Sequence, residues 1–152
     1  MEAKLKEFLT CRLADESYGI DILRIQEIRE FDQITRVPLV SPFVRGVINL
    51  RGSIVPIVDL GLMFGFPEPL DLKKSIIIVL NDNGKYVGLA VSAVSDVVAM
   101  SESEIKPAPD LGRSEINASI SGIGLSGDTS ILLLNVDHLL SKIRSVENAK
   151  AA

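Results

Sequence analysis

The sequence repeats itself, and this internal repeat restricts the possible folds more than any other feature. The segment "FLTCRLADESYGIDILRIQEI" (8–28) aligns with "IIVLNDNGKYVGLAVSAVSDVV" (77–98), and Gly19 falls opposite Gly88 at an offset of 88 − 19 = 69 residues. At that offset Ile22 pairs with Val91, Ile25 with Val94, Glu27 with Asp96 and Ile28 with Val97. The repeat predicts two units of similar fold. Chance similarity between two β-rich segments is the alternative.

A second pair of segments extends the repeat toward the end of each half. "GVINLRGSIVPIVDLGLMF" (46–64) resembles "GIGLSGDTSILLLNVDHLL" (122–140). The alignment places Leu50 opposite Leu125, Gly52 opposite Gly127 and Asp59 opposite Asp137. Because these offsets exceed the first one by several residues, we expect slightly longer loops in the second half.

The apolar residues predict strands. They are mostly Ile, Val and Leu, in runs of four to six separated by Gly, Asn, Asp and Ser, and they belong to a chain that is 47% hydrophobic. This rhythm is typical of strands and turns. Five short strands per half favour a small closed barrel, so we expect a mostly β protein of two packed barrels. Short helices are expected near 59–64 and 136–144, and a long polar loop over 101–121.

Charge and composition exclude several protein classes. The net charge is −4, with two tyrosines, five phenylalanines and no tryptophan, so the basic and aromatic surface typical of nucleic-acid binding is absent. The apolar runs are too short to cross a bilayer. Residues 1–17 are charged throughout and lack the apolar segment of a signal peptide. A single cysteine allows no internal disulfide. We therefore expect a cytoplasmic protein with no direct membrane insertion.

A search for catalytic or metal-binding motifs leaves no convincing site. His138 is the only histidine, and no nucleophile accompanies it. Cys11 is predicted to be a buried structural thiol. Asp59 and Asp137 are expected to cap short helices. The "GIGLSG" motif (122–127) precedes a strand where phosphate binding requires a helix, so we interpret it as a hairpin turn. We expect neither an enzyme nor a bound metal or cofactor.

Two charged residues within apolar surroundings are the remaining candidates. Arg51 lies at a predicted hairpin tip, "NLRGS", where Asn or Asp would suit the turn better. Its repeat counterpart is Ser126, so the fold itself does not require arginine there. Arg51 is either a solvated turn residue or a group kept to bind a carboxylate. Glu27, opposite Asp96 in the repeat, is either a solvated strand residue or an acidic anchor facing Arg51.

Longer motifs resemble those of the CheW family of bacterial chemotaxis coupling proteins. The matching segments are "YGIDILRIQEI", "SPFVRGVINLRGSIVPIVDL", "VGLAVSAVSDV" and "IKPAPDL", and the resemblance runs from about residue 6 to about residue 143. It implies a CheW-like fold of two intertwined, five-stranded SH3-like β-barrels with short helices. We expect one CheW-like domain over 1–152. Its approximate subdomains are 14–71, then 72–140 together with strand 6–13, followed by the helix end and tail at 141–152.

The resemblance also implies a function and a set of contacts. CheW-family proteins are non-enzymatic adaptors that link the cytoplasmic tips of methyl-accepting chemoreceptors to the histidine kinase CheA in signalling arrays. Carried over motif by motif, the receptor contacts are Ile22, Ile25 and Glu27 of "DILRIQE", Arg51 of "NLRG", and the apolar residues Ile76, Leu89 and Val94. The contacts to the CheW-like regulatory domain of CheA are Pro109, Asp110 and Leu111 of "PAPDL".

Other functions compatible with the sequence belong to other classes. A CheW-like module could serve a different receptor–kinase pathway. An oligonucleotide-binding barrel and a small carboxylate hydrolase are also conceivable, but net charge argues against the first and the missing catalytic cluster against the second.

The separate positions of the two contact sets predict separate binding surfaces. Leu111→Ala should weaken binding to the kinase regulatory domain and leave the affinity for a receptor tip unchanged. Titration of the variant with each partner measures both. Equal weakening of both affinities in a folded variant would contradict separate surfaces.

Overall fold

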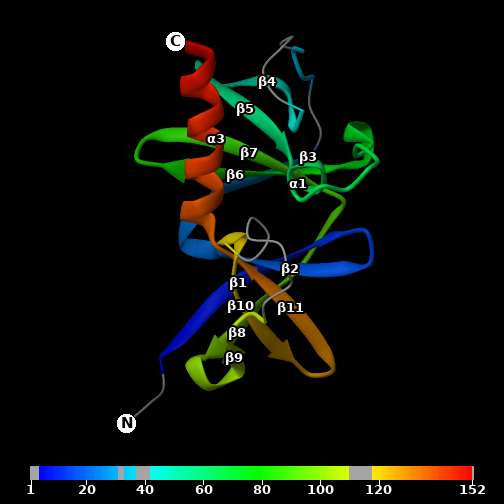
Figure 1. Cartoon of the computed structure of the whole chain (residues 1–152), viewed down its shortest axis with the longest axis vertical. Helices are drawn as coiled ribbons and strands as arrows, with labels where there is room; N and C mark the ends of the chain where they lie inside the picture. Colours follow the sequence, from blue (N-terminus) through cyan, green and yellow to red (C-terminus); the bar gives the residue numbers. More distant parts are fainter. Residues whose placement is uncertain (1–3, 31–32, 37–41, 110–117, 152) are drawn as a thin grey trace.

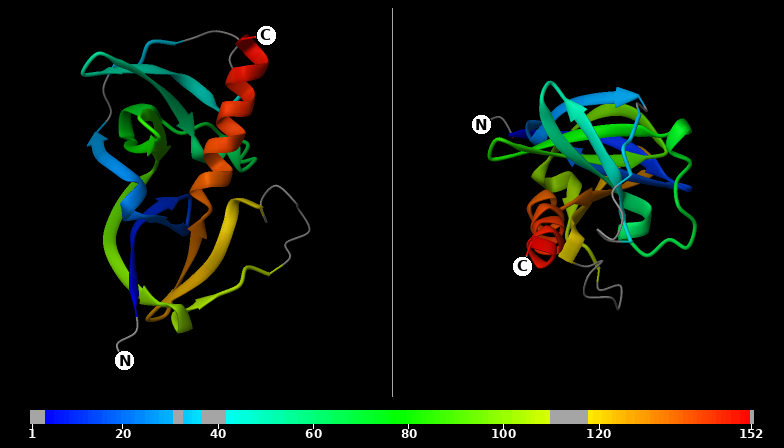
Figure 2. Two further views of the ribbon diagram at one scale, coloured as in Figure 1. Left: turned by 90° about the vertical axis from the view of Figure 1, so that its left-hand side faces the viewer. Right: turned by 90° about the horizontal axis from the view of Figure 1, so that it is seen from above.

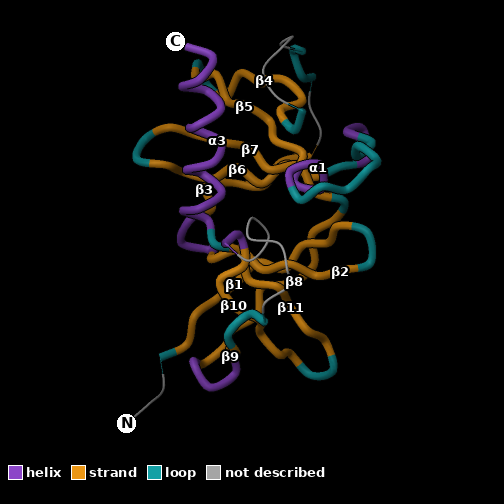
Figure 3. Tube along the Cα trace, viewed as in Figure 1, coloured by secondary structure: helices purple, strands orange, loops and turns teal. Residues whose placement is uncertain are grey.

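The computed structural model describes residues 4–30, 33–36, 42–109 and 118–151, with side chains described as far as residue 144. The strands are β1 (Leu5–Leu13), β2 (Glu16–Asp21), β3 (Ile25–Glu30), β4 (Val44–Leu50), β5 (Ser53–Asp59), β6 (Ile76–Asp82), β7 (Lys85–Val91), β8 (Ala93–Ser101), β9 (Ile105–Lys106), β10 (Ile120–Ser126) and β11 (Thr129–Leu134). The described helices are α1 (Leu60–Met63) and α3 (Val136–Ala151), with single 3-10 turns η1 (Ile22–Arg24), η2 (Leu72–Lys74) and η3 (Glu102–Glu104). Strand dominates the chain, as expected (Figure 3).

The strands form two sheets stacked along the long axis of the molecule (Figure 1). Sheet 1 has five strands in the order β3-β6-β7-β5-β4, and sheet 2 has six in the order β8-β1-β2-β11-β10-β9. Sheet 1 is the upper one in Figure 1 and sheet 2 the lower one. The sixth strand of sheet 2 is the two-residue β9, whose counterpart in sheet 1 is a single bridge between Thr35 and Val47.

The two halves of the sequence exchange their first hairpins. Hairpin β1–β2 from the first half pairs with β8 and β11 in sheet 2, and hairpin β6–β7 from the second half pairs with β3 and β5 in sheet 1. The expected ranges 14–71 and 72–140 follow sequence order, whereas the sheets do not. Of the first half, we expected only strand 6–13 to join the second subdomain. In the structure β2 crosses with β1, because a tight turn joins the two strands of the hairpin.

Strand pairing also fixes the register of the repeat. Bulges between Val44 and Gly46 and between Ile120 and Gly122 match at an offset of 120 − 44 = 76 residues. The Asp59 N–H donates to Phe43 O at 2.7 Å, and the Asn135 N–H donates to Ser119 O at 2.8 Å, at the same offset. Asp59 therefore corresponds to Asn135, and the turn residue Arg51 corresponds to Gly127. The sequence alignment of the second segments was wrong by one to two residues, because it matched the glycines and aspartates by type.

Gly19 and Gly88 mark equivalent close contacts between strands. A Cβ atom at Gly19 would lie 2.8 Å from Leu133 Cδ2, and one at Gly88 would lie 2.6 Å from Ile57 Cδ1. Leu133 and Ile57 are themselves 76 residues apart and occupy the strand paired in parallel with each glycine. The glycines that identify the repeat in the sequence are thus the points where β2 and β7 lie against the β11 and β5 side chains.

The core has three parts. Each sheet encloses a small apolar cluster of its own, which includes Ile57, Ile77 and Val79 in sheet 1 and Phe8 and Leu133 in sheet 2. A larger cluster lies between the sheets. Its members come from both sheets, α1 and α3, and include Cys11, Ile20, Val58, Leu60, Ile78, Leu80, Leu89, Leu139 and Leu140. Strand β6 has side chains in two of these clusters, which explains its unbroken apolar run "IIIVL".

Helix α3 joins the two sheets. It begins directly after β11 of sheet 2 and runs alongside sheet 1 (Figures 1 and 2). Leu139, Leu140 and Ile143 are buried in the shared cluster. Arg144 lies 2.9 Å from Asp82 at the end of β6. Helix α3 continues to Ala151, past the expected end at residue 144. Among the residues described, we find no helix long and apolar enough for a membrane span.

We expect Cys11 to resist thiol reagents while the protein is folded. The side chain is fully buried in the shared cluster, and burial raises the pKa of the thiol to about 12. At about pH 8, labelling by an aromatic disulfide should be slow in buffer and complete in urea. Rapid labelling of the native protein would show that the shared cluster opens readily.

The same pKa predicts a loss of stability in alkali. The ordinary pKa of the thiol is 9.0, so the unfolded chain loses its proton at lower pH than the folded chain. The contribution to the free energy of unfolding is fully present below pH 9 and is lost as the pH rises toward 12. Cys11→Ala should flatten this part of the stability–pH curve.

Candidate docking site

Strand β3 presents different side chains to its two faces because it contains a bulge. The register shifts between Ile25 and Glu27, so Ile25 and Ile28, three residues apart, lie opposite Leu80 and Ile78. Directly paired residues point to the same side of a sheet. Ile25 and Ile28 therefore face the side on which Ile78 and Leu80 join the shared cluster, and Glu27 lies on the opposite face, toward the cluster inside sheet 1.

A hollow of about 440 Å³ lies where the edge strand of sheet 1 meets the edge strand of sheet 2. Its lining comes from β3, the end of η2, the start of β6 and the start of β8, and consists of Ile28, Arg29, Glu30, Lys74, Ile76, Ser92, Ala93 and Val94. Ile28 is 47% exposed, while Ile76 and Val94 are half-buried and pack against the shared cluster. Apolar side chains therefore share the lining of the hollow with three charged ones, Arg29, Glu30 and Lys74.

A short ion pair links the two edges of sheet 1. Arg51 Nη2 lies 2.6 Å from Glu27 Oε1. Glu27 belongs to β3 and Arg51 to the turn between β4 and β5, so the pair joins opposite edges of the strand order. Arg51 has a φ of 50°, in the left-handed region that favours Gly, Asn or Asp. The arginine side chain, 67% exposed, is thus held in a turn position where arginine is unfavourable.

The structure brings some of the expected receptor contacts together and separates others. Ile76 and Val94 share the hollow, and Glu27 and Arg51 form the ion pair. Ile22 and Ile25 are partly buried against the shared cluster. Leu89 is fully buried in that cluster, so it offers no surface to a partner. It belongs to the layer against which Ile76 and Val94 pack. The residues around Leu89 in β7 are apolar without alternation, so the sequence did not indicate which of them are exposed.

Of the expected kinase contacts, only Pro109 is described, and it is exposed. Asp110 and Leu111 lie outside the described residues. Several exposed apolar side chains near β3 were not among the receptor contacts expected from the sequence. Leu23, on η1, is 87% exposed, and Ile54, beside the Arg51 turn, is 66% exposed. Ile28 lines the hollow. Its pairing with the apolar Val97 in the sequence repeat was the one sign that could have marked Ile28 as a site residue.

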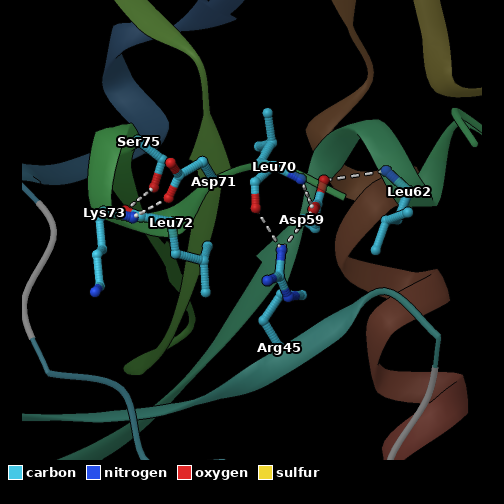
Figure 4. Close-up of polar contacts among 8 residues, drawn as sticks. All are labelled: Arg45, Asp59, Leu62, Leu70, Asp71, Leu72, Lys73 and Ser75. Carbon is cyan, nitrogen blue, oxygen red and sulfur yellow. Dashed lines mark hydrogen bonds and ion pairs between the residues drawn. The ribbon is translucent and has the colours of Figure 1, made fainter. Parts of the chain in front are cut away.

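A buried carboxylate fixes the segment that leads to the hollow (Figure 4). Asp59 has no exposed surface, and its oxygens accept hydrogen bonds from the Leu62 N–H at 3.1 Å and the Leu70 N–H at 2.9 Å. Arg45 Nη1 donates to Asp59 Oδ2 at 3.1 Å and to the Leu70 carbonyl at 2.9 Å. One carboxylate thus caps α1 and, with Arg45, holds both backbone groups of Leu70, just before η2.

The described residues contain no group of three or more His, Cys, Asp or Glu side chains able to hold a metal ion. Asp59 and Arg45 position backbone groups, and the Glu27–Arg51 ion pair links the two edges of sheet 1. Beside them, apolar and charged side chains line the exposed hollow at the junction of the two sheets.

A family model described as "CheW-like domain" matches residues 7–144. The chain belongs to the CheW family. It is 40% identical over 136 residues to chemotaxis protein CheW of Klebsiella aerogenes, covering 90% of this chain and 82% of that protein. CheW of Thermotoga maritima is 30% identical over 143 residues, covering 91% of each. The solved structure of the scaffolding protein TtCheW from Thermoanaerobacter tengcongensis superposes with a TM-score of 0.79 at 34% identity, over 87% of this chain and 90% of that one. The CheW-like fold expected from the motifs is confirmed.

Within this CheW-family fold, the Arg45–Asp59 pair has a neutral counterpart that allows a double-mutant test. The equivalent positions in the second half are Ser121 and Asn135, and Asn135 Oδ1 accepts from the His138 N–H at 3.1 Å. Asp59→Ala should lower the free energy of unfolding by about 3 kcal/mol or more, because it removes the carboxylate that pairs with Arg45 and leaves two backbone N–H groups without their acceptor. The double variant Arg45→Ser/Asp59→Asn should lose less than the sum of the two single changes. Urea unfolding of the wild type, Arg45→Ser, Asp59→Asn and the double variant completes the cycle, and strict additivity would contradict the coupling.

Proposed function

We propose that this protein is a non-enzymatic adaptor of bacterial chemotaxis that couples the cytoplasmic tips of methyl-accepting chemoreceptors to the histidine kinase CheA. The observation that carries this proposal is the CheW-like match across residues 7–144. The structural neighbour TtCheW is a scaffolding protein, which supports the same role. The surface chemistry also fits a scaffold, since apolar side chains, including the exposed Ile28, line a hollow at the junction of the two sheets.

On the receptor side, the proposed surface extends over both faces of the edge strand β3, with the hollow on one face and the Glu27–Arg51 pair on the other. A receptor tip is a helical hairpin, and a helix docks through an apolar ridge in a channel with polar borders. Ile22, Ile25, Ile76 and Val94 all pack against the shared cluster, so a rigid layer supports the apolar surface. Charged groups at the border orient the partner and disfavour incorrect registers.

On the kinase side, the proposed surface includes Pro109, Asp110 and Leu111. Pro109 follows β9, the edge strand of sheet 2, and is exposed. The proposed receptor surface lies at the junction of β3 and β8. A scaffold that joins two partners requires two surfaces of this kind. We place the protein in the cytoplasm, associated with membrane-bound receptor arrays.

Reconstitution tests the function directly. The full chain is mixed with a trimer-forming receptor-tip fragment and the kinase, and kinase activity and co-sedimentation are measured with and without the chain. We expect the chain to bind each partner and to make kinase activity depend on the receptor fragment. Absence of binding to both partners would overturn the proposal.

Arg51→Asn removes the guanidinium group and preserves the conformation of the turn. Asparagine suits a positive φ, and an exposed ion pair is worth about 0–1 kcal/mol, so the melting temperature should be close to that of the wild type. If Arg51 binds a receptor carboxylate, affinity should fall about tenfold or more.

Glu27→Gln is the matched control for this substitution, because it removes the same ion pair and keeps the arginine. It should weaken receptor binding less than Arg51→Asn does. Equal affinities of the two variants would mean that the pair acts only by closing sheet 1.

A further inference from the structure

The lining of the hollow contains positively charged side chains, although the protein as a whole is acidic. The chain carries a net charge of −4. The charged residues that line the hollow are two cations, Arg29 and Lys74, and one anion, Glu30. Lys74 places a positive charge in this lining, and a cation there favours a partner with negative charge at the matching position.

Lys74 is held at this border by an ordered backbone. Asp71 caps η2 by accepting from the Lys73 N–H at 3.1 Å, and the Lys74 N–H donates to Asp71 O at 3.0 Å. Ser75, directly after Lys74, is buried, and its hydroxyl donates to Leu72 O at 2.7 Å. The segment before η2 is fixed by the Asp59–Arg45 contacts to Leu70 (Figure 4). The flexible lysine side chain therefore starts from a defined point.

The side chain of Lys74 forms no hydrogen bond or ion pair with any residue that the structure describes. Four arginines of the described chain form ion pairs: Arg24 with Asp137, Arg45 with Asp59, Arg51 with Glu27, and Arg144 with Asp82. Lys74 is exposed and lies beside Ile76 and Val94 in the lining of the same hollow. It is thus a cation at the side of an apolar channel with its charge available to a partner.

We propose that Lys74 selects among partner helices by pairing with an acidic side chain beside the apolar ridge of the docked helix. This inference rests on the proposed receptor-coupling function and names the chemistry of the helix that the hollow accepts. Apolar residues at positions i, i+3, i+4 and i+7 of such a helix contact Ile28, Ile76 and Val94. An Asp or Glu on the flank of that ridge then lies opposite Lys74. Glu30, at the same border, disfavours a second acidic residue next to it.

Lys73 provides a matched control one residue away. It is exposed and carries the same charge, but it lines a different hollow, with Ile34, Arg36 and Leu70. Lys74→Glu and Lys73→Glu therefore change the net charge of the protein equally, and only the first changes the charge of the docking hollow.

The experiment measures the affinity of the full chain and the two variants for a receptor-tip helical hairpin by calorimetry. We expect Lys74→Glu to weaken binding about tenfold or more and Lys73→Glu to stay within about twofold of the wild type. Raising NaCl from about 50 to about 300 mM should weaken the wild type more than Lys74→Ala, because screening acts on the ion pair. Replacing the responsible Asp or Glu of the tip by Lys should restore binding to Lys74→Glu.

The outcomes separate this inference from the proposed function. If the wild type does not bind the tip, the receptor-coupling function fails. If the wild type binds and Lys74→Glu binds as well as Lys73→Glu does, the receptor function stands and the role of Lys74 is overturned. Circular dichroism of each variant first establishes that the fold is intact.

Discussion

Burial of the apolar cluster between the two sheets is the interaction on which the rest of the structure depends. Each sheet alone encloses only a few side chains, such as Ile57 and Ile77 in sheet 1. The larger cluster takes residues from both sheets and from α3, whereas a small barrel of about 60 residues buries only a modest core by itself. Because each sheet contains a hairpin from the other half, neither half can complete a sheet without the other.

The candidate docking site is a direct product of this arrangement. Exchange of the hairpins makes β3 and β8 the edge strands of different sheets, and their junction forms the hollow. A bulge at the equivalent point of each strand turns two apolar residues toward one side, Ile25 and Ile28 in β3 and Val94 and Val97 in β8. The channel is therefore part of the sheet framework, which favours a preformed surface for a partner.

Much of this site could be predicted from the sequence, and the exceptions have physical reasons. The offset of 69 residues correctly paired Ile25 with Val94, and the possible contact of Glu27 with Arg51 is confirmed by the ion pair. The burial of Leu89 was not predictable, because strands buried on both faces show no alternation. Lys74 gave no signal either, since it reaches the hollow only because Asp59 and Arg45 fix Leu70, a contact between distant segments.

The exchange of hairpins has a consequence for how the two halves can change. In a pair of identical chains, every substitution would appear twice, once on each side of the symmetry axis. Joining two such halves in one chain makes the exchange intramolecular and lets each member of an equivalent pair vary alone. The differences follow this rule: Arg45 and Asp59 stand where the other half has Ser121 and Asn135, and Arg51 stands where it has Gly127. These differences give two halves of similar fold different surfaces, which suits the proposed role of presenting different faces to different partners.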